Sequence, residues 1–211
     1  MALPEQLQNL RIPLIGSPLF IVSNPELVIA QCTSGIVGSF PALNAREAPG
    51  EAIELDKWLT RISEALDAHN QSDPDHPAAP FAVNQIVHKS NARLERDVEI
   101  CVKHKVPIWI TSLGAQDWVY EAAHSVGAIV LHDIINDFFA RKAIAKGADG
   151  LIAVAAGAGG HAGALSPMAL IQEIREWFDG PVYLSGAIAK GDSILAAQAM
   201  GADGGYAGSA F

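Results

Sequence analysis

Residues 150–163 read GLIAVAAGAGGHAG. The run from Leu151 to Val154 is continuous and apolar, with the length of a strand buried on both faces, as in a parallel sheet. The glycines that follow permit positive φ and carry no side chain, so backbone there can lie close to a flat or bulky ligand. His161 adds a titratable group that can transfer a proton near neutral pH. By itself the stretch is equally typical of an ordinary strand-to-helix loop that contains a histidine.

Outside this stretch, one junction recurs along the chain. It reads Val126-Gly127-Ala128, Lys146-Gly147-Ala148-Asp149 and Met200-Gly201-Ala202-Asp203. Glycine after a helix supplies the left-handed residue that ends it, so each junction indicates a helix leading into a strand. Hydrophobic periodicity and turn residues predict strands at about 12–15, 36–40, 81–83, 106–111, 129–132, 151–154, 181–184 and 204–207. They predict helices at about 24–33, 55–66, 94–102, 116–125, 138–146, 166–178 and 192–200, and a loop at 41–50.

Eight strands alternating with seven helices indicate right-handed βαβ crossovers and a parallel sheet. The predicted fold is an α/β (β/α)₈ TIM barrel, as one domain over residues 1–211. Such barrels typically take about 250 residues. Because the sequence stops where an eighth helix would begin, we expect the C-terminal part, with that helix, to be missing or truncated.

Composition limits which partners and which cellular compartment we expect for this protein. Half of the 211 residues are hydrophobic and the net charge is −9, which argues against nucleic acid. Cys32 and Cys101 have no metal-site spacing and are expected to be reduced thiols of a cytoplasmic protein. The uncharged segment 150–172 has the length of a membrane span, but its glycines and Pro167 favour a buried strand, loop and helix. We expect no signal peptide, no membrane partner and no metal.

Ligands of this fold bind where the strands end, on the loops that lead into the helices. The candidate residues there are Ser17, Pro18, Asn84, Thr111, His132, Asp133, Gly159, Gly160, His161, Ser185, Gly186, Ala187, Gly208 and Ser209. The loops after strands seven and eight form the usual phosphate site. Backbone N–H groups of Gly186, Ala187, Gly208 and Ser209, with the Ser185 and Ser209 hydroxyls, could bind a phosphate without a lysine. The alternative is ordinary turn chemistry, since Ser-Gly and Gly-Ser pairs are common in loops.

His132 ends the predicted fifth strand and is a candidate for contact with cofactor or substrate. The remaining histidines fall in helices or linking segments and are expected to be structural or solvated. The sequence has no G-x-S-x-G motif, which argues against serine hydrolase chemistry.

Three segments carry a resemblance to a known family: AGAGGHAG after strand six, LSGAIAKG after strand seven and GADGGYAGSAF at strand eight. They resemble the nitronate monooxygenases, formerly called 2-nitropropane dioxygenases, and FAVNQ and PLIGSPL agree. Members of that family are FMN-dependent TIM barrels that oxidise alkyl nitronates with O₂ to a carbonyl compound and nitrite. The resemblance implies FMN as cofactor and His161 as catalytic base. It also implies that Asn84, the Ser17-Pro18 turn and the glycine loop surround the flavin.

The sequence departs from the family at the phosphate end. Gly186-Ala187 stands where many relatives have Gly-Gly, and Gly208-Ser209-Ala210-Phe211 where many have Gly-Thr-Arg-Phe. Serine keeps the hydroxyl, but the arginine charge near the phosphate is lost. Relatives also continue into a C-terminal segment that helps to cover the flavin.

Several alternatives stay open. One is an NAD(P)H-dependent flavin reductase of quinones or enoyl thioesters. Another is a flavin-free barrel, an isomerase or lyase acting on a phosphorylated metabolite, and a third is a degenerate barrel that serves as a binding or assembly module. The expected partners of the leading hypothesis are a small-molecule substrate and O₂, and the assemblies left open include a homodimer.

Overall fold

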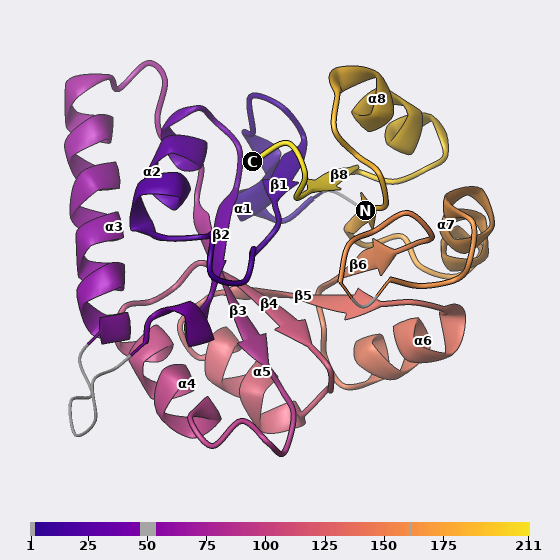
Figure 1. Cartoon of the computed structure of the whole chain (residues 1–211), viewed down its shortest axis with the longest axis horizontal. Coiled ribbons are helices and arrows are strands. Elements are labelled where there is room, and N and C mark those ends of the chain that lie inside the picture. The colour runs from indigo at the N-terminus through magenta and orange to yellow at the C-terminus, as the bar shows by residue number, and fades with distance from the viewer. Residues whose placement is uncertain (1–2, 47–53, 161) are drawn as a thin grey trace.

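The computed structural model describes residues 3–46, 54–160 and 162–211. Its eight parallel strands surround a central axis, with the longer helices outside them (Figure 1). The strands are β1 (Leu14–Gly16), β2 (Gly38–Pro41), β3 (Phe81–Ile86), β4 (Ile108–Ser112), β5 (Ile129–Ile134), β6 (Gly150–Val154), β7 (Val182–Ser185) and β8 (Gly204–Ala207). They pair in the order β1-β8-β7-β6-β5-β4-β3-β2, and an Ile15–Val37 bridge joins β1 to β2. The expected TIM barrel is confirmed.

The predicted helices between the strands are also confirmed. They are α2 (Pro25–Thr33), α3 (Glu54–Ser72), α4 (Leu94–Lys103), α5 (Asp117–His124), α6 (Asp137–Ala145), α7 (Pro167–Arg175) and α8 (Gly191–Ala199). Two short elements were not predicted: α1 (Glu5–Gln8) and the 3₁₀ helix η1 (Ala42–Asn44) in the expected loop 41–50, of which residues 47–50 lie outside the described residues. Leu7 of α1 is buried with the apolar residues of the barrel interior.

Local signals in the sequence account for the helix boundaries. The Asn24 and Asn136 side chains accept hydrogen bonds from the N–H groups of Leu27 and Phe139, at 2.9 and 3.0 Å, which begins α2 and α6. Gly127, Gly147 and Gly201, the glycines of the recurring junction, have φ of +76°, +101° and +108°. Glycine adopts this left-handed region without steric strain, so each of these glycines ends its helix.

Apolar residues form two layers that follow the alternation of side chains along the strands. One layer fills the barrel interior and includes Ile108, Ile110, Ile129 and Leu131. The other lies between sheet and helices and includes Trp109, Val130, Cys32 and Cys101. Both cysteines are free and buried, and burial raises the pKa of Cys32 to about 12. The layers establish which residue at each strand end faces the barrel axis.

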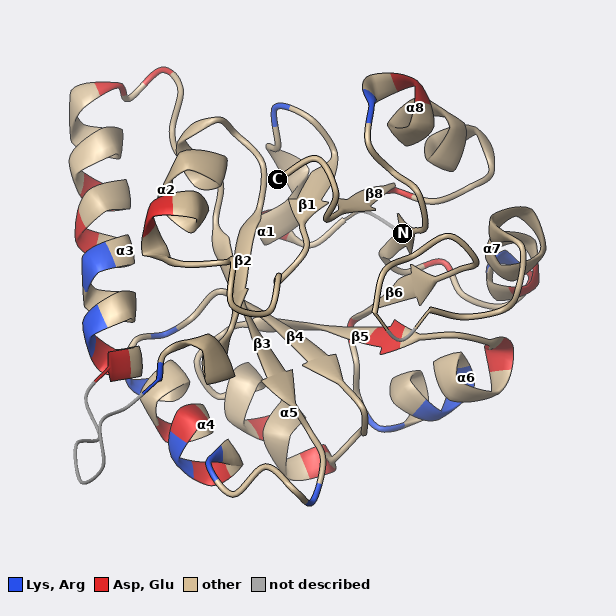
Figure 2. Cartoon of the chain, in the orientation of Figure 1, with Lys and Arg blue, Asp and Glu red and all other residues tan. Residues whose placement is uncertain are grey.

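Charged residues of both signs are interspersed over the outer helices (Figure 2). Near its tip β5 carries an acidic residue, Asp133. Within the described part of the chain, no helix is long and apolar enough to cross a membrane, and no three His, Cys, Asp or Glu side chains group as a metal ion would require.

Candidate functional site

A cavity of about 1040 Å³ opens at the carboxyl ends of the strands. Most of the predicted site residues line it: Ser17, Pro18, Asn84, His132, Gly159, Gly160, Ser185, Gly208 and Ser209. Thr111, Gly186 and Ala187 are not among the lining residues. His161 lies outside the described residues, so its assignment remains a prediction from sequence.

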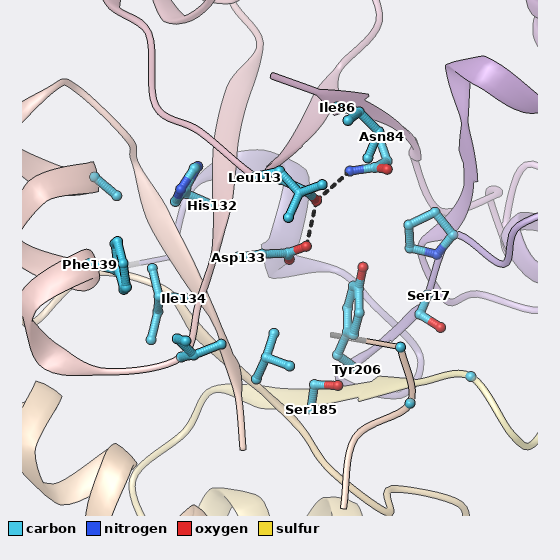
Figure 3. Close-up of a pocket in the computed structure, with 18 of the residues that line it drawn as sticks. Ser17, Asn84, Ile86, Leu113, His132, Asp133, Ile134, Phe139, Ser185 and Tyr206 are labelled. Carbon is cyan, nitrogen blue, oxygen red and sulfur yellow. Dashed lines mark hydrogen bonds between the residues drawn. The ribbon is translucent and has the colours of Figure 1, made fainter. Parts of the chain in front are cut away.

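A chain of hydrogen bonds crosses one wall of the cavity over three adjacent strands (Figure 3). The Asn84 amide on β3 donates to the Ser112 hydroxyl on β4 at 2.8 Å, and to the carbonyl of Ile110 at 3.2 Å. Ser112 in turn donates to Asp133 Oδ2 on β5 at 2.5 Å. The Tyr206 ring of β8 stands opposite (Figure 3). The chain fixes the Asn84 side chain and places a carboxyl group on the cavity wall.

Among the described residues, no cation compensates the charge of the Asp133 carboxylate. Burial raises its pKa to about 6, and the hydrogen bond from Ser112 acts in the opposite direction. Its second oxygen, Oδ1, is buried and finds no hydrogen-bond partner among the described residues. Burial first, and the Asp133 charge second, raise the pKa of Tyr206, so that phenol stays protonated. Asp133 can therefore exchange a proton close to neutral pH.

Replacement of Asp133 by asparagine should stabilise the protein at pH 7–8 by about 1–3 kcal/mol, because the pKa difference from an unfolded value of 3.8 is worth about 3 kcal/mol before relaxation. The native state binds the proton more tightly than the unfolded state, so the wild type should lose stability as pH rises from about 4 to 6 and stay level above that. Denaturant midpoints at several pH values measure both effects.

Asp133→Asn should give no advantage at pH 3.5, where both side chains are uncharged, and Asp192→Asn on the exposed start of α8 serves as the surface control. If the stabilities of the wild type and of Asp133→Asn changed in parallel with pH, Asp133 would not be the titrating group.

The loops after β7 and β8 hold the predicted phosphate donors. Gly186 has a φ of +145°, and the backbone N–H groups of Gly186, Gly208 and Ser209 have no acceptor within the described residues. Ala187 differs, because its N–H donates to the carbonyl of Gly157 at 3.1 Å. The Ala187 N–H, one of the four donors predicted to bind the phosphate, is therefore already used within the protein. The Gly208 and Ser209 N–H groups line the cavity with the Ser17 and Ser185 hydroxyls, and this set matches the donors that a phosphate monoester requires. Gly186 follows Ser185 directly but is not itself a lining residue.

Glycines on the wall after β6 leave room for a flat ligand. A Cβ added at Gly159 or Gly160 would meet no atom of the described residues within 4 Å, their chain neighbours apart. Gly159 has no positive φ that would require glycine for its conformation. Neither packing nor backbone geometry accounts for Gly159, whereas a planar ring lying against the backbone would. Together with the amides after β7 and β8, this wall fits a flavin that carries a phosphate.

Two predicted residues lie on the other face of the sheet. Thr111 is fully buried, and its hydroxyl and that of Tyr120 on α5 contact His132 Nδ1 at 2.7 and 3.0 Å. The strand ends were placed one or two residues early, at Thr111 and His132, whereas β4 ends at Ser112 and β5 at Ile134. Because strand residues alternate, the side chains on the axis are Ser112 and Asp133. The interior layer of Ile108, Ile110, Ile129 and Leu131 is the signal that identifies them.

Comparison with known proteins finds one matching family model and several similar proteins. A family model described as "Nitronate monooxygenase" matches residues 6–211. A nitronate monooxygenase of Neurospora crassa is 25% identical over 225 residues, covering 94% of this chain and 59% of that protein. A second relative, from Rhodococcus jostii, is a (3aS,4S,5R,7aS)-5-hydroxy-7a-methyl-1-oxo-octahydro-1H-indene-4-carboxyl-CoA dehydrogenase. It is 23% identical over 206 residues, which cover 98% of this chain and 53% of that protein.

Among solved structures, the nitroalkane oxidase of Streptomyces ansochromogenes superposes with a TM-score of 0.79 at 21% identity. The match covers 95% of this chain and 65% of that one, and it shows the shared fold. The chain spans between half and three fifths of the length of these two curated relatives.

Proposed function

Since the chain belongs to the nitronate monooxygenase family, we propose that it is an FMN-dependent oxidoreductase that converts alkyl nitronates or nitroalkanes and O₂ to a carbonyl compound and nitrite. The observation that carries the proposal is the cavity at the strand ends, with free backbone donors at one end and a glycine wall beside it. Bound FMN would supply the electron-accepting ring that the protein's side chains lack.

The residues have separate tasks in this proposal. The N–H groups of Gly186, Gly208 and Ser209 bind the phosphate, and Gly159 and Gly160 admit the ring. Asn84, whose amide nitrogen donates to Ile110 and Ser112, offers its amide oxygen to the ligand. His161 removes the proton from the carbon next to the nitro group of a neutral substrate, or orients a substrate that is already a nitronate.

Absorption spectra test the proposal. The purified protein incubated with FMN should show the bound-flavin spectrum, and an alkyl nitronate should bleach it without oxygen whereas NADH should not. Rapid bleaching by NADH would favour a reductase of quinones or enoyl thioesters, which the similarity to a carboxyl-CoA dehydrogenase keeps as the second candidate. A protein that stays colourless with FMN would contradict both and favour the flavin-free barrel.

The two buried free cysteines support a reducing compartment, and we propose that the protein is located in the cytoplasm.

Ser185→Ala should weaken FMN binding by about 10- to 100-fold, the value of one hydrogen bond to a charged group. The Ser185 side chain lines the cavity at the end of β7 and is 9% exposed. Quenching of flavin fluorescence gives the dissociation constant. The control is Ser125→Ala, because the wild-type Ser125 hydroxyl lies on the surface and donates to the Ala122 carbonyl. Equal affinity in wild type and Ser185→Ala would remove this hydroxyl from the phosphate site.

A further inference from the structure

The cavity continues past β5 to a second set of residues on the outer face of the sheet. Its lining residues there are His132, Ile134, Phe139, Lys142 and Ala143, which we call the outer lobe. Figure 3 shows His132, Ile134 and Phe139 together, away from Asp133, Asn84 and Tyr206. Alternation along β5 accounts for this division, and α6 supplies the remaining wall.

The hydrogen bonds around His132 determine which of its nitrogens carries the proton. Thr111 and Tyr120 are 0% and 1% exposed, and burial raises the pKa of Tyr120 to about 12, so both hydroxyls keep their protons. The acceptor that the described residues offer to this pair is His132 Nδ1, at 2.7 and 3.0 Å. One hydroxyl can donate to Nδ1 and the other to its neighbouring hydroxyl. If Nδ1 carried a proton, one buried hydroxyl would lose its acceptor, which is costly.

His132 is therefore a neutral imidazole with its proton on Nε2. Burial lowers its pKa to about 4, so the ring stays uncharged at neutral pH. Nε2 has no hydrogen-bond partner among the described residues and is not one of the buried, unpaired atoms, so it faces the cavity. The outer lobe thus contains an N–H donor that is held in place and free to bind a ligand.

The charge and apolar surface of the outer lobe define what the donor would meet. Lys142 is exposed, and no ion pair joins it to an acidic side chain in the described part of the chain. Ile134, Phe139 and Ala143 make the rest of the lobe apolar, and Phe139 is 43% exposed. A fixed neutral donor, a free cation and an apolar wall together match an oxyanion carried on an apolar chain.

We propose that the outer lobe is a subsite for an oxyanion on an apolar chain, bound by His132 Nε2–H and Lys142 while the chain packs on Ile134, Phe139 and Ala143. A carboxylate and a phosphate ester share this chemistry. The subsite extends the substrate site proposed above, but its occupancy does not require flavin or turnover.

Binding of octanoate, octyl phosphate and octanol to the full chain at pH 7 tests the proposal by calorimetry. Octanoate or octyl phosphate should bind at least about 10-fold more tightly than octanol. Preference for octanoate identifies a carboxylate ligand, and preference for octyl phosphate identifies a phosphate ester. Equal affinity for all three would overturn the oxyanion assignment.

Variants locate the binding. Lys142→Met should lower the affinity for the anionic probe about 10-fold and leave the affinity for octanol unchanged. The control is Lys146→Met, because Lys146 pairs with Asp117 and does not line the cavity, and it should change neither affinity. His132→Gln should keep part of the affinity through its amide donor, and His132→Leu should lose it. Unchanged affinity in Lys142→Met would overturn the proposal even if the His132 variants misfold.

Nitrogen NMR of the histidine ring adds a readout that does not depend on a variant. His132 should appear as the Nε2–H tautomer down to about pH 5, and its Nε2 resonance should shift on addition of the anionic probe. An Nδ1–H tautomer would contradict the donor role. FMN binding, read from the visible spectrum, is independent of these results, so failure of the subsite is distinguishable from failure of the flavin proposal.

Discussion

His161→Ala should fold and bind FMN, yet lose about 10²–10⁴-fold in turnover of a neutral nitroalkane, the usual contribution of a general base. The residue follows a buried strand within a run of glycines, and the neighbouring Gly159 and Gly160 line the cavity without being needed for packing. Its replacement should therefore change chemistry more than stability. Steady-state rates with the nitroalkane, together with the flavin spectrum and melting temperature, measure all three properties.

The preformed nitronate provides the control for this variant. It has already lost its proton, so the loss with this substrate should be much smaller than with the nitroalkane. Equal losses on both would assign His161 a positioning or electrostatic role. Unchanged rates on both would remove it from the mechanism.

Gly208→Asp should reduce FMN affinity by about 10³-fold or more. A Cβ at this position would lie 2.8 Å from Ser17 Oγ and 3.2 Å from the Leu19 side chain, on the wall that is to receive the phosphate. A carboxylate about 4 Å from a phosphate charge is unfavourable by about 4 kcal/mol at the effective dielectric of a protein surface. Flavin fluorescence quenching measures the change.

Gly208→Asn separates charge from size, since asparagine has nearly the same shape without the charge. It should retain substantially more affinity than Gly208→Asp, and a rise in salt should reduce the difference. Circular dichroism must show the same fold in both variants. FMN affinity in Gly208→Asp equal to that of the wild type would place the phosphate elsewhere.

Much of the fold was predictable because its signals are local. The glycines of the recurring junctions adopt the left-handed conformation that ends each helix, and asparagine caps begin α2 and α6. The short α1 was not predictable, because four residues carry no periodicity and its stability depends on the burial of Leu7 under the barrel.

The strand ends were predicted to within two residues, and those residues decide which side chains face the barrel axis. Ending β4 one position early selects Thr111 instead of Ser112. Ending β5 two positions early favours His132 over its neighbour Asp133 for contact with the ligand, although both were placed at that strand end. Each strand position alternates between barrel axis and helix layer, so a small error in a boundary exchanges the two environments. The Ala187 N–H shows a second limit, since its acceptor, Gly157, is brought by a loop some 30 residues earlier in the sequence.

The closure between β1 and β2 has a consequence for the protein's behaviour in concentrated solution. Hydrogen bonds join the Gly16 N–H to the Val37 carbonyl at 2.8 Å and the Val37 N–H to the Leu14 carbonyl at 3.1 Å, and the Ser39 hydroxyl donates to the Gly16 carbonyl. β1 pairs with β8 over three residues but meets β2 through one bridge. If these few bonds opened, the ring would become an open sheet with free edges at β1 and β2. Exposed edge strands pair with other chains, so the closure between β1 and β2 protects the protein against aggregation.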